Sequence, residues 1–240
     1  MFVQEINKNE SNKMDWIMGF ISGVLISTVV DDTKIDGGGT HKEMETYLLA
    51  MNKKGKKELN DLRIKTRIRD FAKRILPRPR SKAELISSIE KWEKNPSAYQ
   101  PLSAWDTSKI TDMSRLFRFK ENFNGDIGGW DTSNVTNMSN MFEGASSFNR
   151  PIGNWDTSNV KNMHAMFEDA VSFNQDISRW NMKNVNDISN MFYGANSFDK
   201  DISAWDTQNV RDMSHIFSYA NSHKHDISEW NTDNVIYPYF

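Results

Sequence analysis

Apolar residues in the second half of the chain recur in columns spaced 25 residues apart. Each period opens with a tryptophan, and further apolar residues follow at fixed offsets, as in Val135, Met138, Met141, Phe142 and Ala145. This spacing is typical of one face of a short helix or of a run of tight helical turns. A constant period of roughly 20–50 residues predicts a solenoid in which each repeat forms one rung.

The second part of each period leaves room only for a short strand, between Phe148 and Ile152 in the copy that starts at Trp130. Strict alternation would bury Gln175 in the next copy, so the strand either starts later, near the aspartate, or carries a bulge. We predict an α/β solenoid over residues 99–240, a leucine-rich-repeat-like, right-handed stack of five full repeats with partial ends, each made of a short strand and a short helix. Its predicted core contains Trp130, Trp155, Trp180, Trp205, Phe142, Phe167, Phe192, Met138, Met163 and Ile177.

Two polar columns run through the same repeats. An asparagine recurs four residues after each tryptophan from the second copy on, at Asn134, Asn159, Asn184, Asn209 and Asn234. Stacked amides can hydrogen-bond to one another and to the backbone of a neighbouring turn, so we interpret this column as a structural ladder rather than a ligand site. The aspartate after most tryptophans suits an Asx-turn or a helix cap. Stacked carboxylates could recruit cations, but their spacing matches no known calcium loop, and no metal or cofactor is predicted.

The repeat unit, W-D-x-S-x-V-x-x-M-S-x-M-F-x-x-A-x-x-F-N-x-D-I-S, resembles the BspA-like leucine-rich repeat family over residues 99–240. That family is known from bacterial surface proteins, protists and large DNA viruses. The resemblance implies a surface-exposed repeat domain, of a kind that in some members adheres to host proteins, and it supplies no catalytic residues. The chain has no cysteine, which departs from the bacterial members that are anchored through a lipid-modified cysteine.

Within the segment at residues 1–52, residues 16–30 form an unbroken run of fifteen residues without a charge. We interpret them as a membrane anchor or interfacial helix, with a buried helix and a cleaved signal as alternatives. The segment opens with Trp16, and Gly19, Gly23 and Ser27 form a small-residue row typical of helix packing in bilayers. Further on, Ser81 and Glu84 predict a capping box that opens a helix over residues 81–98, the expected cap of the solenoid.

Charge is distributed unevenly. Residues 53–82 hold thirteen Lys and Arg against three acids, whereas residues 99–240 hold eleven against eighteen. Residues 53–80 form a predicted basic amphipathic helix or linker, with a basic patch at Arg63, Lys65, Arg67, Arg69, Lys73 and Arg74. Such a block suits a surface helix, an anionic membrane surface or nucleic-acid phosphates, and nucleic acid is the least favoured because no nucleic-acid-binding fold accompanies it.

We therefore expect a non-enzymatic protein-binding or scaffolding solenoid that is tethered to a membrane or to a structural assembly. It is expected to be membrane-associated, at a cell surface or as a minor capsid or other structural protein of a virion. The alternative is a soluble adaptor or nucleic-acid-associated factor that uses residues 53–82. Catalysis is not expected, because the Ser, His and Asp residues recur through repetition and form no convergent constellation. The one histidine cluster, His223 with His225, lacks a further strong ligand for a metal.

Overall fold

A computed structural model describes residues 77–96 and 101–237 of the chain. The chain divides into two compact units, Met1–Pro77 and Arg78–Phe240, and apart from Pro77 the described residues all belong to the second. The predicted anchor at residues 16–30 and residues 53–76 of the predicted basic segment lie outside the described residues.

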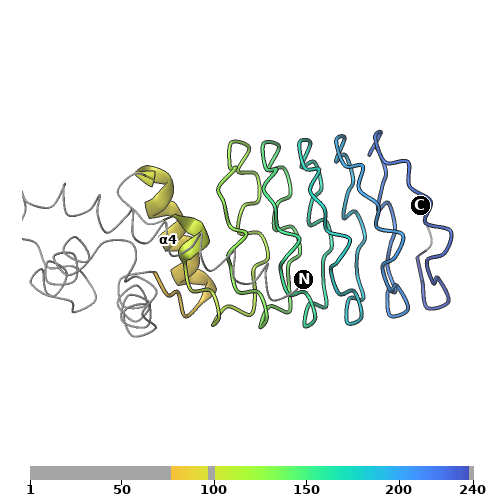
Figure 1. Ribbon diagram of the computed structural model, residues 1–240, viewed down its shortest axis with the longest axis horizontal. Coiled ribbons are helices and arrows are strands. Elements are labelled where there is room, and N and C mark those ends of the chain that lie inside the picture. Colours follow the sequence, from red (N-terminus) through yellow and green to blue (C-terminus); the bar gives the residue numbers. More distant parts are fainter. Residues whose placement is uncertain (1–76, 97–100, 238–240) are drawn as a thin grey trace, which may run out of the picture. The chain divides into compact units, whose positions relative to one another are not determined.

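Helix α4 spans Lys82–Lys94 and precedes the repeats (Figure 1). Ser81 is its N-cap, because the Ser81 hydroxyl accepts a hydrogen bond from the Glu84 N–H at 3.2 Å, as its sequence predicts. The reciprocal half of the predicted capping box differs. The Glu84 carboxylate accepts from the N–H of Arg80, at 2.7 Å, rather than from that of Ser81.

The apolar face of α4 covers the first repeat. Leu85 and Ile89 lie one turn apart and are buried in the same cluster as the core of the repeats. Trp92 packs edge-on against Phe123, with 6.5 Å between the ring centroids. A short 3₁₀ helix, η2 (Leu102–Ala104), then leads into the first full repeat.

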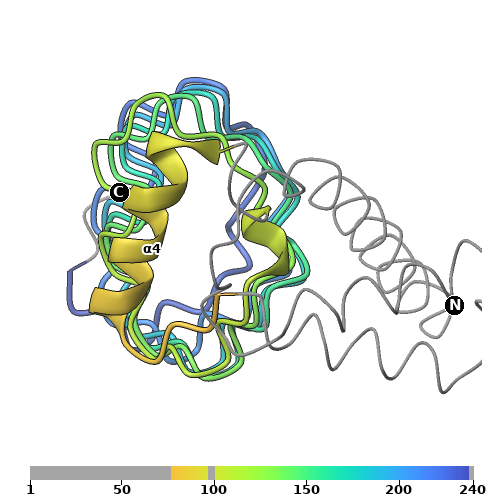
Figure 2. The same ribbon diagram turned by 90° about the vertical axis from the view of Figure 1, so that its left-hand side faces the viewer.

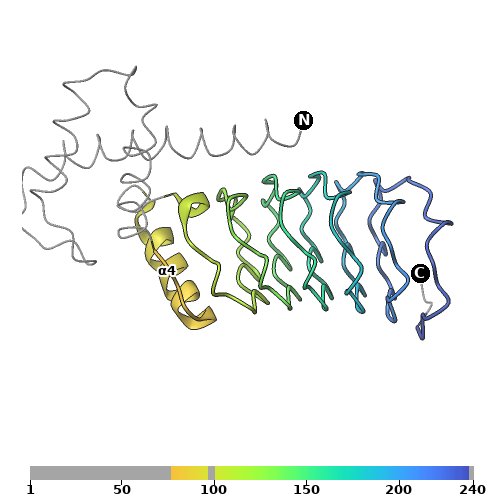
Figure 3. The same cartoon turned by 60° about the horizontal axis from the view of Figure 1, so that its bottom comes forward.

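Successive repeats lie side by side in chain order (Figures 1 and 3). Viewed along the series, their traces superpose around a common centre (Figure 2). Single parallel β-bridges join residues 25 positions apart, namely Asp112 to Asn137, Asn137 to Asn162, Asn162 to Asp187, Asp187 to Asp212 and Asp212 to Tyr237. The bridges are isolated, and residues 101–237 contain no longer strand.

The segment with the helical stripe is a run of tight turns. The N–H groups of Met138, Asn140 and Phe142 donate to carbonyl groups of the next repeat. Between them, the Ser139 N–H donates to the side chain of Asn137 and the Met141 N–H donates to the carbonyl of Met138. Asn140 and Gly144 have positive φ angles of 57° and 68°, which a right-handed helix does not allow. Because tight turns of about three residues nearly match the helical period, the apolar side chains still face one side.

Two expectations for the repeat therefore differ from what its described residues show. The short helix predicted in each repeat is not formed between 105 and 237, because alternate N–H groups bond to the neighbouring repeat. The segment between Phe148 and Ile152 carries no bridge, and the bridging residue is Asn137, just before the turn run. The leucine-rich-repeat-like class, the right-handed winding and the boundaries at 53, 81 and 99 stay predictions.

Two phenylalanine columns interleave in the core. The ring of Phe142 stacks on Phe148 of its own repeat at 4.0 Å and on Phe167 of the next repeat at 5.5 Å. Indole rings stack alongside them, with 6.4 Å between Trp155 and Trp180. The ten core residues predicted from the sequence are each at most 4% exposed: Trp130, Trp155, Trp180, Trp205, Phe142, Phe167, Phe192, Met138, Met163 and Ile177.

From Trp130 on, each tryptophan also links its repeat to the chain just before the preceding tryptophan. From Trp130 on, each indole N–H donates to a carbonyl 28 residues earlier, as Trp155 does to Ile127 at 3.2 Å and Trp180 to Ile152 at 3.1 Å. In the part of the chain that the structure describes, the buried indole N–H of Trp105 has no such partner. The residue 28 positions before Trp105 is Pro77, which lies ahead of α4 and outside the repeats.

Candidate binding surface

The turn after each tryptophan uses its polar side chains for local structure. Asp131 accepts hydrogen bonds at Oδ1 from the N–H and the hydroxyl of Ser133, at 3.0 and 2.6 Å, which is an Asx-turn. Asn134 donates from Nδ2 to the carbonyl of Ser108 at 2.9 Å. The same bond to a carbonyl 26 residues earlier, at 2.6–2.8 Å, is made by Asn159, Asn184, Asn209 and Asn234. The asparagine ladder thus runs from amide to backbone.

Two further ladders are visible only in the structure. Buried threonine hydroxyls donate to the next repeat, as Thr132 does to the carbonyl of Asp156 at 2.9 Å. Separately, Asn149 accepts at Oδ1 from the N–H of Asn174 at 3.0 Å, and Asn124 and Asn174 act in the same way. The recurring threonine after Trp-Asp and the asparagine after phenylalanine were the available signals in the sequence. They were missed because the backbone phase of those segments was not known.

The end of each turn run differs strongly between the repeats. We call its residues the turn ridge, and they vary in charge, size and aromatic character: Arg118, Phe119, Glu143, Gly144, Glu168, Asp169, Tyr193, Gly194, Ser218 and Tyr219. The ladder positions, in contrast, keep nearly the same residue in every repeat. Arg118, Phe119, Asp169 and Tyr219 of the ridge are exposed, whereas Glu143 is buried. Variation at exposed positions of a repeat is expected where partners are recognised.

Side-chain contacts connect neighbouring members of the turn ridge. The Arg118 guanidinium donates to both carboxylate oxygens of Glu143, each at 2.7 Å, and lies 4.5 Å from the centroid of the Phe119 ring. At the other end, Tyr193 and Tyr219 meet edge-on at 5.1 Å. Phe119 is 63% exposed and Tyr219 is 69% exposed, so the ridge presents an aromatic ring near each end.

Both exposed rings stand at a backbone position that favours glycine. Phe119 and Tyr219 have φ angles of 57° and 60°, at the place that Gly144 and Gly194 occupy in alternate repeats. Bulky residues are rare in this left-handed region. The Phe119 ring leans over Gly144, where an added Cβ would lie 2.6 Å from a ring carbon, so the glycine leaves room for the ring of the preceding repeat.

The middle of the turn ridge is acidic. Burial raises the pKa of Glu168, and the neighbouring carboxylates of Glu143 and Asp169 raise it further. Arg118 and His164 act in the opposite direction, and Arg118 is already bonded to Glu143. The ridge therefore carries two kinds of group. In its middle are the carboxylates of Glu168 and Asp169, which are not the partners of Arg118. Near its ends are the exposed rings of Phe119 and Tyr219.

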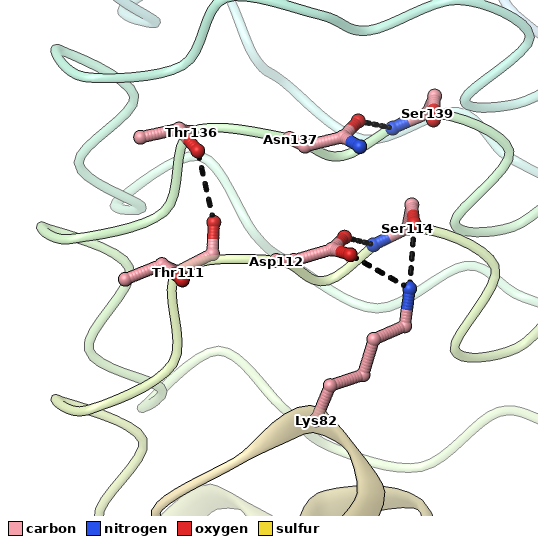
Figure 4. A network of polar contacts seen from close by, with 7 residues as sticks. All are labelled: Lys82, Thr111, Asp112, Ser114, Thr136, Asn137 and Ser139. Carbon is pink, nitrogen blue, oxygen red and sulfur yellow. Dashed lines mark hydrogen bonds and ion pairs between the residues drawn. The ribbon is translucent and has the colours of Figure 1, made fainter.

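A polar network fastens α4 to the first repeat (Figure 4). The Lys82 ammonium donates to Asp112 Oδ2 at 3.1 Å and to the Ser114 hydroxyl at 2.6 Å. Asp112 Oδ1 meanwhile accepts from the Ser114 N–H at 2.7 Å, and Asn137 repeats this turn with Ser139. Burial raises the pKa of Asp112, but the hydrogen bonds from Ser114 and Lys82 outweigh it and leave the pKa below its usual value.

Neither a metal centre nor a membrane span is found in the described segments. No group of three or more His, Asp or Glu side chains within residues 77–96 and 101–237 is placed to hold an ion. Over the same residues, no helix is both long and apolar enough to cross a bilayer. The predicted membrane and basic-patch residues lie outside them, at Trp16, Gly19, Gly23, Ser27, Arg63, Lys65, Arg67, Arg69, Lys73 and Arg74.

Comparison with known proteins gives one match. The model of a family described as "Mycoplasma protein of unknown function, DUF285" matches residues 87–196 and 175–238. These two ranges overlap and together cover the repeats and most of α4. No curated protein and no solved structure matches the chain.

Proposed function

The chain belongs to this family of unknown function, and from its own residues we propose that it is a non-enzymatic protein-binding or scaffolding module of the BspA-like type. The repeats hold the turn ridge in a fixed arrangement for a protein partner. The N-terminal residues tether the module to a membrane or structural assembly, at a cell surface or in a virion. The resemblance of the repeat unit to BspA-like surface proteins supports this role.

The exposure of Phe119 and Tyr219 is the observation that carries the proposal. Large aromatic side chains dominate the energetics of protein interfaces when a partner buries them. Both rings are more than half exposed and occupy left-handed backbone positions, so neither burial nor local conformation accounts for an aromatic residue there. Binding of a partner would offset the cost of exposing these rings to water and the cost of their left-handed backbone conformation.

The proposal assigns no catalysis to the repeats. Their recurring Asp, Asn and Thr side chains are engaged in Asx-turns and in ladders between repeats, as Asp131, Asn134 and Thr132 show. Groups used in this way stabilise the stack and are not available as an acid, a base or a nucleophile. The turn ridge is one of the parts that differ between repeats, and its variation suits recognition.

Site-specific photo-crosslinking tests the binding role. A photoreactive phenylalanine analogue is placed at position 119 or 219 of the full chain, in cells that carry the protein. A matched control carries the analogue at Ile86, which is 37% exposed on α4. We expect one defined protein to be crosslinked from positions 119 and 219 and not from 86. Equal crosslinking from all three positions, or none from the ridge, would rule the ridge out as the binding surface.

Flotation with liposomes tests the tether. The full chain and a chain that begins at Ser81 are mixed with vesicles containing anionic lipid, at low and at high salt. We expect only the full chain to float, and to remain bound at high salt because insertion of apolar residues is insensitive to screening. Flotation at low salt alone would indicate purely electrostatic binding by residues 53–82. If neither chain floats, a structural assembly rather than a membrane holds the protein.

A further inference from the structure

One of the two phenylalanine columns ends in a histidine. Its members are Phe123, Phe148, Phe173 and Phe198, and His223 takes the same place in the fifth repeat. The His223 ring stacks on Phe217 with 4.0 Å between centroids and 6° between planes. The equivalent pair of the preceding repeat, Phe192 and Phe198, has the same 4.0 Å separation. His223 is therefore held as one more aromatic ring of the column.

The ring nitrogens of His223 lack hydrogen-bond partners among the described residues. Nδ1 and Nε2 of His223 are both buried, and neither has a hydrogen-bond partner within the described residues. A buried polar nitrogen without a partner carries a desolvation cost, and a protonated ring would carry a larger one. The packing thus favours the neutral ring.

The charged groups around His223 come from its own repeat and from the preceding one. His225 lies 5.8 Å away between ring centroids, and Lys224 lies between the two histidines in the chain. His225 Nε2 is 3.4 Å from Asp199 Oδ1, a contact without hydrogen-bond geometry because that oxygen has no hydrogen-bond partner among the described residues. Asp201 is the second carboxylate that acts on His223.

These surroundings act on His223 in opposite directions. Burial lowers the pKa of His223, and the nearby His225 lowers it further. Asp199 and Asp201 raise it, but the pKa stays below the usual value of 6.5. The contact with His225 places the Asp199 carboxylate against that histidine rather than against His223.

We propose that His223 is an acid-sensitive switch at the C-terminal end of the described repeats. The neutral ring completes the phenylalanine column and holds residues 221–237 on the preceding repeat. The protonated ring leaves the column, and residues 221–237 separate from the rest of the stack. This device is independent of the partner proposed for the turn ridge.

Hydrogen bonds, ring stacking and the bridge from Asp212 to Tyr237 hold residues 221–237 on the stack. Trp230 donates to the carbonyl of Ile202 at 3.2 Å and stacks on Trp205 at 6.1 Å. Ile236 donates from its N–H to the carbonyl of Arg211 at 2.8 Å, and Asn234 makes the last bond of the asparagine ladder. Segments at the edge of a stack open locally at a lower free energy than the whole domain, so protonation of one ring shifts their equilibrium.

Hydrogen exchange of the full chain between pH 7.5 and 5 tests the switch, with rates converted to protection factors to remove the intrinsic effect of pH. The open state binds the proton with an ordinary pKa and the closed state with a lower one, so stability is lost as pH falls below about 6.5. The sign follows from linkage, which sets a limit of about tenfold per pH unit for one proton. We expect protection of residues 221–237 to fall by up to that factor, while residues 155–180 stay unchanged.

Two variants give the decisive comparison. His223→Phe restores the residue of the other four repeats and should abolish the pH dependence of residues 221–237. His215→Gln alters an exposed histidine of the same repeat and should leave the dependence intact. An unchanged dependence in His223→Phe, its loss in His215→Gln, or constant protection in the unaltered chain would each overturn the proposal.

Discussion

The Lys82 ammonium lies 3.1 Å from the Asp112 carboxylate, so a side chain from the first turn of α4 takes the place next to the first bridging residue. Next to each later bridging residue, that position is taken by the bridging residue of the preceding repeat. On the same helix, Leu85 and Ile89 are buried in the hydrophobic core of the repeats. The helix is thus joined to the stack by both polar and apolar contacts.

Replacing Lys82 by methionine should weaken this junction. The pair is partly exposed, with side-chain exposures of 29% and 44%, so we expect a loss of about 0.5–1 kcal/mol in the free energy of unfolding. Chemical denaturation at pH 7 measures it. Lys91→Met, on the exposed side of the last helical turn, is the matched control, and an equal loss there would assign no special role to Lys82.

Acid should weaken the same junction. The pKa of Asp112 is below its usual value of 3.8, so its contribution is complete above about pH 4 and is lost as pH falls through the lowered pKa. We expect the difference in stability between the unaltered chain and Lys82→Met to shrink as the pH falls through this range. A difference that stays constant down to pH 2 would contradict the assignment.

Truncating a buried ring in the middle of the stack should be far more costly. Phe167 is fully buried and stacks on Phe142, Phe173 and Phe192, so Phe167→Ala should cost about 3–5 kcal/mol. Phe119→Ala removes the same ring from an exposed position and should change stability by less than about 0.5 kcal/mol. Thermal and denaturant unfolding of both variants would show whether the phenylalanine column faces the core.

The threonine ladder should contribute through its buried hydroxyls. Thr157 donates to the carbonyl of Asn181 at 3.1 Å and is 1% exposed. Thr157→Val keeps the shape and leaves that carbonyl without its partner, so we expect a loss of about 1–2 kcal/mol. Thr136→Val alters an exposed threonine of the second repeat and should cost less. Equal costs would mean that burial of the hydroxyl does not matter.

Substitutions at residues with positive φ angles test the backbone conformation of the turn run. Gly194 has a φ of 65°, and a Cβ there would lie 2.1 Å from Asp169 Oδ1, so Gly194→Ala should cost about 1–3 kcal/mol. Asn190 is also left-handed, at 54°, and Asn190→Gly should be nearly neutral because glycine adopts this conformation without strain. A neutral Gly194→Ala would show that the turn run relaxes locally.

The sequence predicted the buried columns and the cap at Ser81 because both depend on residue type and spacing alone. It left a short helix and a run of tight turns as alternatives, because an apolar stripe at Val135, Met138 and Phe142 fits both equally well. What separates them is where alternate N–H groups donate, and that depends on a neighbour 24 residues away. The prominence of Phe119 and Tyr219 was also missed, since both occupy a column that glycine fills elsewhere.

The tryptophan tie has a consequence for how such a chain can change in length. From Trp130 on each indole reaches back 28 residues, each amide of the asparagine ladder reaches back 26, and alternate N–H groups of the turn run reach forward 24. Inserting or deleting one residue breaks all three kinds of link at once, whereas adding or removing 25 residues restores every one. Growth and shrinkage by whole-unit duplication or loss is therefore the route that keeps the interlocking intact.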